Sequence, residues 1–231
     1  MVRRYSDHAL TKRTPVSDIF DEVSEDLRAD RTRALLRRYG VWLIAAAVAV
    51  VLATAGYEAW SSHRKAEADL EGAKFLAASE IADGPADKRR DALPALLDLA
   101  QNGHGGYRTL ARLRAAAVLA DSHDLPGALA QWDAVASDTS AEADLRSFAD
   151  LQWALHQVDQ GDISVVETRL QKLTGTGATW RSLALEGEAL LAIRQGQPDR
   201  ARGLLKSLTT DTTATDSVRG RAAGLLQQIG G

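Results

Sequence analysis

The sequence of 231 residues contains no cysteine, which excludes disulfide frameworks, thiolate zinc sites, iron–sulfur clusters and a cysteine nucleophile. Aromatic residues make up only 5% of the chain, and runs of β-branched residues are almost confined to one short stretch. This scarcity disfavours an all-β fold. Alanine and leucine are abundant, and a hydrophobic content of 45% is sufficient for a packed core, so the composition predicts an all-α protein.

The chain also lacks a strong excess of charge: 28 basic side chains stand against 31 acidic ones, which leaves a net charge of −3. This balance argues against a nucleic-acid partner. The two ends of the chain differ, however. Residues 1–38 hold nine Lys and Arg against seven Asp and Glu, whereas residues 58–231 hold 19 against 24. The difference predicts that the two segments lie in different compartments.

The groupings that catalysis, metal binding and cofactor binding require are missing as well. The five histidines are scattered without the spacing of metal ligands. Gly103-x-Gly105-Gly106 precedes a predicted helix, but no strand comes before it and its spacing does not fit a dinucleotide loop. We therefore expect no catalytic, cofactor-binding or metal-binding residue, no cofactor, and no enzymatic activity.

One long apolar run is present. No charged residue occurs from Tyr39 to Tyr57, and these 19 residues would span about 28 Å as a helix, close to the hydrocarbon thickness of a bilayer. Aromatic rings at both ends of the run suit the headgroup regions. We predict a transmembrane helix over residues 39–60, with a buried core helix as the alternative. The residues expected at the two membrane interfaces are Arg37, Arg38, Tyr39, Trp42, Tyr57 and Trp60.

The arginines predict the orientation of this helix. Five lie within about 15 residues before the run, whereas only Arg64 and Lys65 follow it closely. The positive-inside rule then places residues 1–38 in the cytoplasm and exports the rest. A cleavable signal peptide is the competing interpretation, because Ala53-Thr54-Ala55 has the small-x-small form of a cleavage site. The long, acid-containing leading segment argues against cleavage.

The cytoplasmic arm combines a tail over residues 1–16 with a predicted amphipathic helix. Ser17 can cap this helix, whose acidic residues gather near its start and whose arginines gather near its end, as the helix dipole favours. Ile19, Phe20 and Val23 begin an apolar stripe on it. The stripe could rest on the membrane surface or bind a cytoplasmic or membrane protein partner.

Residues 61–231 show a repeated pattern, in which a small or branched residue is followed by large apolar residues four and seven positions later. These offsets share one helix face. Successive starting residues are 36, 38 and 35 apart, near the period of about 34 of tetratricopeptide repeats. The pattern predicts a degenerate α-solenoid of helix pairs, with residues 217–229 as a terminal cap. The packing residues are Ala128, Trp132, Val135, Val166, Leu170, Leu173, Ala201, Leu205 and Leu208, with a looser set at Ala92, Leu96 and Leu99.

The position of Pro94 in the first repeat leaves two interpretations open. It could begin a shorter helix, or it could kink a helix that begins near Lys88. The partner helices of the pairs are expected over residues 106–119, 142–158 and 179–194.

The layout resembles the YfgM-like family of bacterial inner-membrane proteins, which are ancillary to the Sec translocon. The likeness rests on DIFDEV from residue 18, DLR from residue 26, Tyr39-Gly40, and the helix pair over residues 183–205. The resemblance implies a non-catalytic inner-membrane protein with a periplasmic repeat domain. Its expected partners are translocon subunits and periplasmic chaperones or exported client proteins, besides the lipid bilayer. The rival hypothesis is a bitopic envelope-stress signalling protein whose cytoplasmic arm sequesters a regulator.

Overall fold

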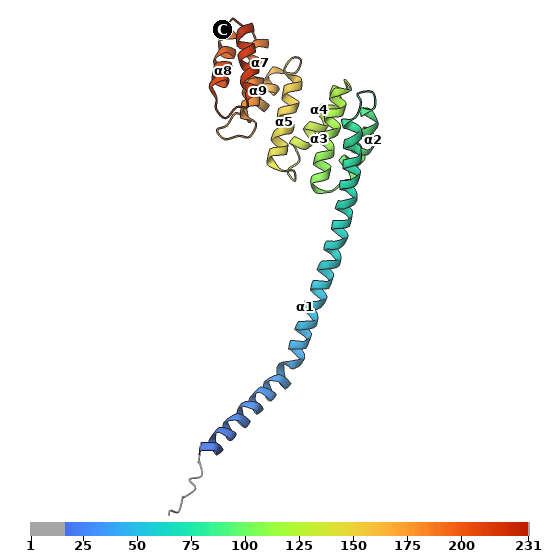
Figure 1. Ribbon diagram of the computed structural model, residues 1–231, viewed down its shortest axis with the longest axis vertical. Helices are drawn as coiled ribbons and strands as arrows, with labels where there is room; N and C mark the ends of the chain where they lie inside the picture. The colour runs from blue at the N-terminus through green and yellow to red at the C-terminus, as the bar shows by residue number, and fades with distance from the viewer. Residues whose placement is uncertain (1–16, 231) are drawn as a thin grey trace, which may run out of the picture. The chain divides into compact units, whose positions relative to one another are not determined.

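The computed structural model describes residues 17–230, with side chains from residue 37 onward. Over this range every regular element is helical, which confirms the all-α prediction. The chain divides into an N-terminal unit, Met1–Arg64, and a repeat unit, Lys65–Gly231. The predicted tail over residues 1–16 lies outside the described residues. Figure 1 shows the succession of helices from α1 to α9.

Helix α1 spans Ser17–Asp83 and therefore contributes to both units. It ends where the sequence predicts a stop, since Gly84 and Pro85 follow directly and the Gly84 amide donates to the Ile81 carbonyl at 3.1 Å. Within the repeat unit, α1 packs closely on the next helix pair. A Cβ at Gly72 would lie 2.6 Å from the Tyr107 hydroxyl oxygen, so only glycine fits there without a shift of that side chain.

The first pair decides between the two interpretations of Pro94. A short 3-10 helix covers Arg89–Ala92, and α2 follows over Leu93–Asn102. Pro94 lies in the first turn of α2, where its missing amide hydrogen leaves no helical bond unmade. It therefore begins a shorter helix and does not kink a longer one.

Consecutive helices from α2 to α9 contact one another along the repeat unit, coloured green to red in Figure 1. Short loops join them, and several helices begin at a side-chain cap: Asp124, Asp162 and Thr215 accept hydrogen bonds from amides of the first turns of α4, α6 and α9. The remaining helices are α3 Gly105–Asp121, α4 Leu125–Ala136, α5 Ala143–Gln157, α6 Ile163–Gln171, α7 Arg181–Arg194, α8 Pro198–Thr210 and α9 Asp216–Gln228.

The core of the repeat unit is a series of small clusters, each shared by neighbouring helices. One cluster joins α5, α6 and α7 around Leu151, Leu170 and Leu191. Another joins α7, α8 and α9 around Leu205 and Leu208. This succession is typical of repeat proteins, in which each pair buries the apolar face of its neighbour.

Candidate protein-binding surface and membrane segment

The six predicted membrane-interface residues all lie on α1 with exposed side chains. Exposure is notable for the four aromatic residues, since arginines such as Arg37 and Arg38 are usually exposed. The Tyr57 and Trp60 rings lie 6.3 Å apart, and the Arg64 guanidinium lies 4.3 Å from the centroid of the Trp60 ring. The Arg38 guanidinium lies 5.8 Å from the centroid of the Tyr39 ring. Aromatic rings and arginines therefore lie together at both ends of the apolar run.

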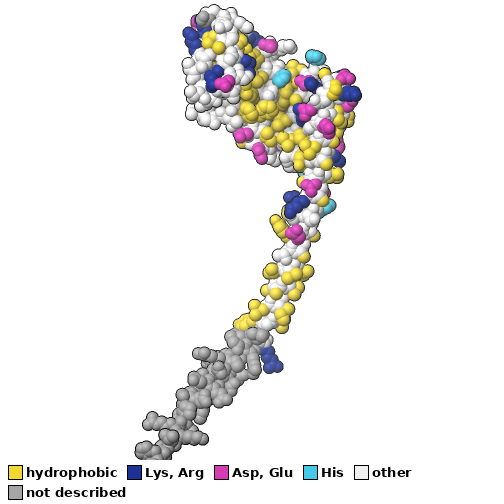
Figure 2. Space-filling view, in the orientation of Figure 1, with side chains coloured by type: hydrophobic (Ala, Val, Ile, Leu, Met, Phe, Trp, Pro, Cys, Tyr) yellow, Lys and Arg dark blue, Asp and Glu magenta, His cyan; other side chains and the backbone are white. Residues whose placement is uncertain are grey.

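Between these ends, the apolar side chains of α1 are exposed and are not covered by the other described residues. Among the described residues, one helix is long and apolar enough to cross a membrane; an 18-residue window in it has a mean hydropathy of 2.0, and none of that window is buried. Figure 2 shows hydrophobic side chains along this part of α1. A buried core helix, the alternative raised by the sequence, would have most of this surface covered. The segment is compatible with a single-pass membrane protein.

The candidate partner-binding residues of the arm, Ile19, Phe20 and Val23, fall within the backbone range of α1. Their side chains lie outside the described residues. The stripe that they begin stays a prediction.

The nine packing residues of the repeats are all buried. Three of them lie on α4, and Ala201, Leu205 and Leu208 lie on α8. Val166 and Leu170 lie on α6, and Leu173 comes just after the end of α6, where it remains only 5% exposed. The second helix of each pair thus presents these side chains to the interior of the repeat unit.

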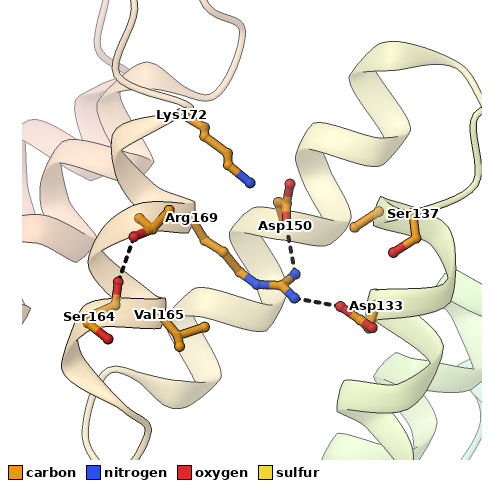
Figure 3. Close-up of a pocket in the computed structure, with 9 residues that line it drawn as sticks. Asp133, Ser137, Asp150, Ser164, Val165, Arg169 and Lys172 are labelled. Carbon is orange, nitrogen blue, oxygen red and sulfur yellow. Dashed lines mark hydrogen bonds and ion pairs between the residues drawn. The ribbon is translucent and has the colours of Figure 1, made fainter.

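A groove of about 350 Å³ lies over α5 between α4 and α6. Figure 3 shows the Arg169 side chain reaching from α6 into its centre. The groove is lined by Asp133, Ala136, Ser137, Asp150, Ser164, Val165, Thr168, Arg169 and Lys172.

Arg169 organises the charge at the floor of this groove. Its Nη1 donates to Asp150 Oδ1 on α5 at 2.7 Å, and its Nη2 donates to Asp133 on α4. Its guanidinium also lies 4.1 Å from the centroid of the Trp153 ring. A planar cation that is hydrogen-bonded at its edge and stacked on its face is held in one orientation. Arg169 therefore ties three helices together and leaves the floor polar.

The wall of the groove offers both apolar and charged groups to a ligand. Val165 is 41% exposed, and Ala136 lines the groove from the end of α4. Lys172 points into the groove from the end of α6 (Figure 3). An open groove with an apolar wall and paired charges suits an extended peptide segment. Within the part of the chain that the structure describes, no group of His, Asp and Glu residues could hold a metal ion.

Helix α7 buries two glutamates in different environments. The Glu186 carboxylate is held by a bidentate pair with Arg221 of α9, with both N–O distances 2.6 Å. This hydrogen bonding raises the pKa of the Arg221 guanidinium. Glu188 has no such partner, and burial raises its carboxyl pKa; the charge of Arg200 opposes this effect and that of Glu167 adds to it.

The loop containing Gly103-x-Gly105-Gly106 binds the carboxylate of Glu71 on α1. The His104 amide donates to the Glu71 carboxylate at 3.0 Å, and His104 Nδ1 lies 2.8 Å from the same carboxylate. Burial alone would raise the pKa of Glu71, but these hydrogen bonds outweigh it and lower the pKa below its usual value. The loop therefore serves to join α1 to the turn between α2 and α3.

These polar contacts were not identified from the sequence, although many contacts between helices share a spacing. Six of them join residues that are 31 to 36 positions apart, about one repeat. Pairing each arginine with an acid one repeat away would have found several of them. The pairs are Asp83 with Arg114, Arg89 with Asp121, Asp133 with Arg169, Asp144 with Trp180, Val158 with Arg194, and Glu186 with Arg221.

The stacked helix pairs define a helical-repeat protein. The described chain also carries an open groove on these repeats and an exposed apolar run on α1. The chain belongs to the tetratricopeptide repeat-like domain family, whose profile matches residues 33–215. The match includes the apolar run as well as the repeats. No curated protein and no solved structure matches the chain.

Membership of this family gives the general function. A tetratricopeptide-like repeat domain is typically a protein-binding scaffold and not a catalytic domain, and its partners are other proteins.

Proposed function

We propose that the protein is a membrane-anchored periplasmic scaffold of the YfgM-like kind. In this proposal residues 1–38 are cytoplasmic, residues 39–60 cross the bacterial inner membrane, and residues 61–231 form the periplasmic repeat domain. As an ancillary subunit of the Sec translocon, it would link newly exported proteins to periplasmic chaperones. The observation that carries the proposal is the combination of an uncovered apolar helix with a family of protein-binding repeats in one chain.

The apolar helix supports the anchoring part of the proposal. Its side chains are exposed, so water would solvate them poorly, whereas a bilayer would cover them all. The preceding arginines favour a cytoplasmic N-terminus. An exported repeat domain would then be held where polypeptides leave the translocon.

The groove over α5 supports the scaffold part. Its wall carries the exposed Val165, and its floor carries the fixed guanidinium of Arg169. An unfolded exported segment presents apolar side chains and free backbone carbonyls, which these two features can contact. Such weak, general contacts suit a transient client better than a single fixed partner.

The test is photocrosslinking in intact cells with a photoreactive amino acid at Val165 in the groove wall. We expect crosslinks to translocon subunits, periplasmic chaperones or exported proteins. Gln171 is the matched control, because it lies on the same helix, is exposed, and does not line the groove. The same probe at Phe20 reports on the cytoplasmic arm.

Two results would contradict the proposal. One is equal capture of the same proteins from Val165 and Gln171. The other is capture of a soluble cytosolic regulator through Phe20 with no specific product from Val165, which would support the signalling hypothesis instead.

A further inference from the structure

The part of α1 that belongs to the repeat unit has two apolar faces. One packs into the unit, where Phe75, Ala78 and Ala82 contact α2 and α3. The opposite face has no such cover. Leu70 is 59% exposed, Leu76 is 69% exposed and Ile81 is 43% exposed.

These three side chains stand out within their unit. Among the described residues of the repeat unit, the other large apolar side chains that are exposed reach at most 41%. Leucines exposed to this degree on one helix are typical of a surface that another protein covers. The exposed face must therefore be explained separately from the groove over α5.

The spacing on this face is that of a coiled coil. Ala66, Leu70, Ala73 and Ala77 are separated by four, three and four residues, and all four side chains are exposed. A repeat of 3.5 residues keeps such a stripe facing a partner helix in a left-handed supercoil. Toward the N-terminus, the next position of this pattern is His63, and beyond it the same alternation of spacings resumes with Ala59, Gly56, Leu52, Ala49 and Ala45.

We propose that this stripe, Ala66 to Ala77 with Leu76 and Ile81 at its edge, pairs two copies of the chain as a parallel coiled coil. If Leu70 and Ala77 occupy the a positions, Ala66 and Ala73 occupy the d positions. The alanines let the two helices approach closely, and the Leu70 side chains pack against each other at the seam.

The flanking residues fit a second copy in parallel orientation. Asp69 occupies a g position and Lys74 the following e position, so Asp69 of each copy faces Lys74 of the partner subunit. Leu76 and Ile81 occupy the next g and e positions and make an apolar contact in the same way. Glu80 occupies the d position before Ile81, so the apolar seam itself ends at Ala77. An antiparallel pair would place g against g and e against e, and would lose both matches.

A membrane surface fits this face less well. Asp69 lies beside the stripe and Glu80 follows it in line; both are exposed, and anionic headgroups would repel their carboxylates. The inference goes beyond the proposed function, because it does not depend on which proteins bind the groove over α5.

Disulfide crosslinking tests the pairing directly, since the chain has no cysteine of its own. Single Ala66→Cys and Ala73→Cys variants of the full-length chain would be oxidised in native membranes and examined on a non-reducing gel. We expect several-fold more dimer from either variant than from Ala68→Cys, an exposed alanine at the outward f position of the same helix. Equal dimer from Ala68→Cys, or no dimer from the stripe, would overturn the proposal.

Charge exchange tests the orientation. In the Ala73→Cys background, Asp69→Lys should reduce the crosslinked dimer, because lysines would then face lysines across the pair. Adding Lys74→Asp should restore it. Dimer that forms only between co-expressed Ala66→Cys and Ile81→Cys chains would instead show an antiparallel pair and overturn the parallel one.

These outcomes are distinct from those of the photocrosslinking test. Val165 crosslinks that persist in a chain with the Asp69→Lys change would show that client binding survives when the dimer is lost. Stripe crosslinks in a chain with no specific Val165 product would support the dimer and contradict the scaffold.

Discussion

The apolar run of α1 and the repeat unit use the same residue types with opposite burial. Ala45, Ala46 and Ala47 on α1 are exposed, whereas Ala115 and Ala116 on α3 are fully buried. Both segments are helical, since a helix satisfies its backbone hydrogen bonds internally. An alanine-rich composition therefore favours a helix in both segments, but the positions of the polar residues determine which face of each helix is buried by the protein. Polar residues between the apolar positions of α3 direct one face inward, and the run on α1 has no such interruption.

Charged residues placed in the apolar run of α1 should have the largest effect, because they would remove its difference from the repeat unit. Arginine near the centre of a membrane helix costs about 2.5–3.5 kcal/mol on insertion scales, so Val48→Arg combined with Leu52→Arg should move most of the chain out of the membrane. The measurement is the fraction that resists alkaline carbonate extraction. Gln171→Arg, on an exposed position of α6, should leave this fraction unchanged. Full retention of the double variant would mean that another part of the chain holds it to the membrane.

The next largest effect is expected in the repeat unit. Leu170 is fully buried between α5, α6 and α7, so Leu170→Ala should lower the free energy of unfolding by about 2–5 kcal/mol through lost burial and a cavity. Thermal unfolding of the full chain in detergent would measure the change, and carbonate resistance should not alter. Val165→Ala on the exposed face of α6 is the control, expected to change stability by no more than about 0.5 kcal/mol.

Enlarging a buried side chain of the repeat unit should lower the free energy of unfolding by a smaller amount. Ala201 is fully buried on α8, so Ala201→Leu should separate the paired helices and cost about 1–3 kcal/mol. Gly203 lies two residues further on with nothing near its missing Cβ, so Gly203→Ala should leave stability unchanged or raise it by up to about 1 kcal/mol. Undiminished thermal stability of Ala201→Leu would contradict the inward orientation of Ala201.

The smallest effect concerns the two buried glutamates of α7, which should respond to pH differently. Burial raises the pKa of Glu188, so this group favours the folded state while protonated. Its contribution is complete below the pKa of the unfolded chain and is lost as pH rises through the higher folded pKa. Glu188→Gln should therefore raise the Tm by about 1–3 °C at neutral pH and by less in mild acid.

Glu186→Gln provides the matched comparison for that experiment. It removes the carboxylate that Arg221 grips from α9, so it should lower the Tm at neutral pH. The same direction of change for both variants would show that Glu188 is paired in solution.

The helical fold could be predicted from the sequence because its signals are local. Gly84 and Pro85 end α1 where turn residues predict it, and the offsets of four and seven identify residues such as Leu170 that are buried. Pro94 could not be interpreted in the same way. Whether it starts or kinks a helix depends on the preceding turn at Arg89–Ala92, which no periodic pattern marks.

The groove and the buried glutamates depend on contacts between repeats. The sequence LEGE within α7 gives no sign that Glu186 meets Arg221 or that burial raises the pKa of Glu188 against the charge of Arg200. Arg169 similarly owes its position to Asp133 and Asp150 on two earlier helices. The repeat register decides which of these side chains meet, because a shift of one residue turns a helix by about 100° and moves its side chains onto a different face.

The spacing of these polar contacts has a consequence for how the protein could change over evolutionary time. Arg194 binds the backbone carbonyl of Val158, and Arg169 binds Asp133, in each case 36 residues away. A duplicated repeat would therefore carry its own donor to the preceding repeat and its own acceptor for the following one. The array could lengthen by recombination in whole repeats without redesign of the junctions, and the apolar run of α1 would be unaffected.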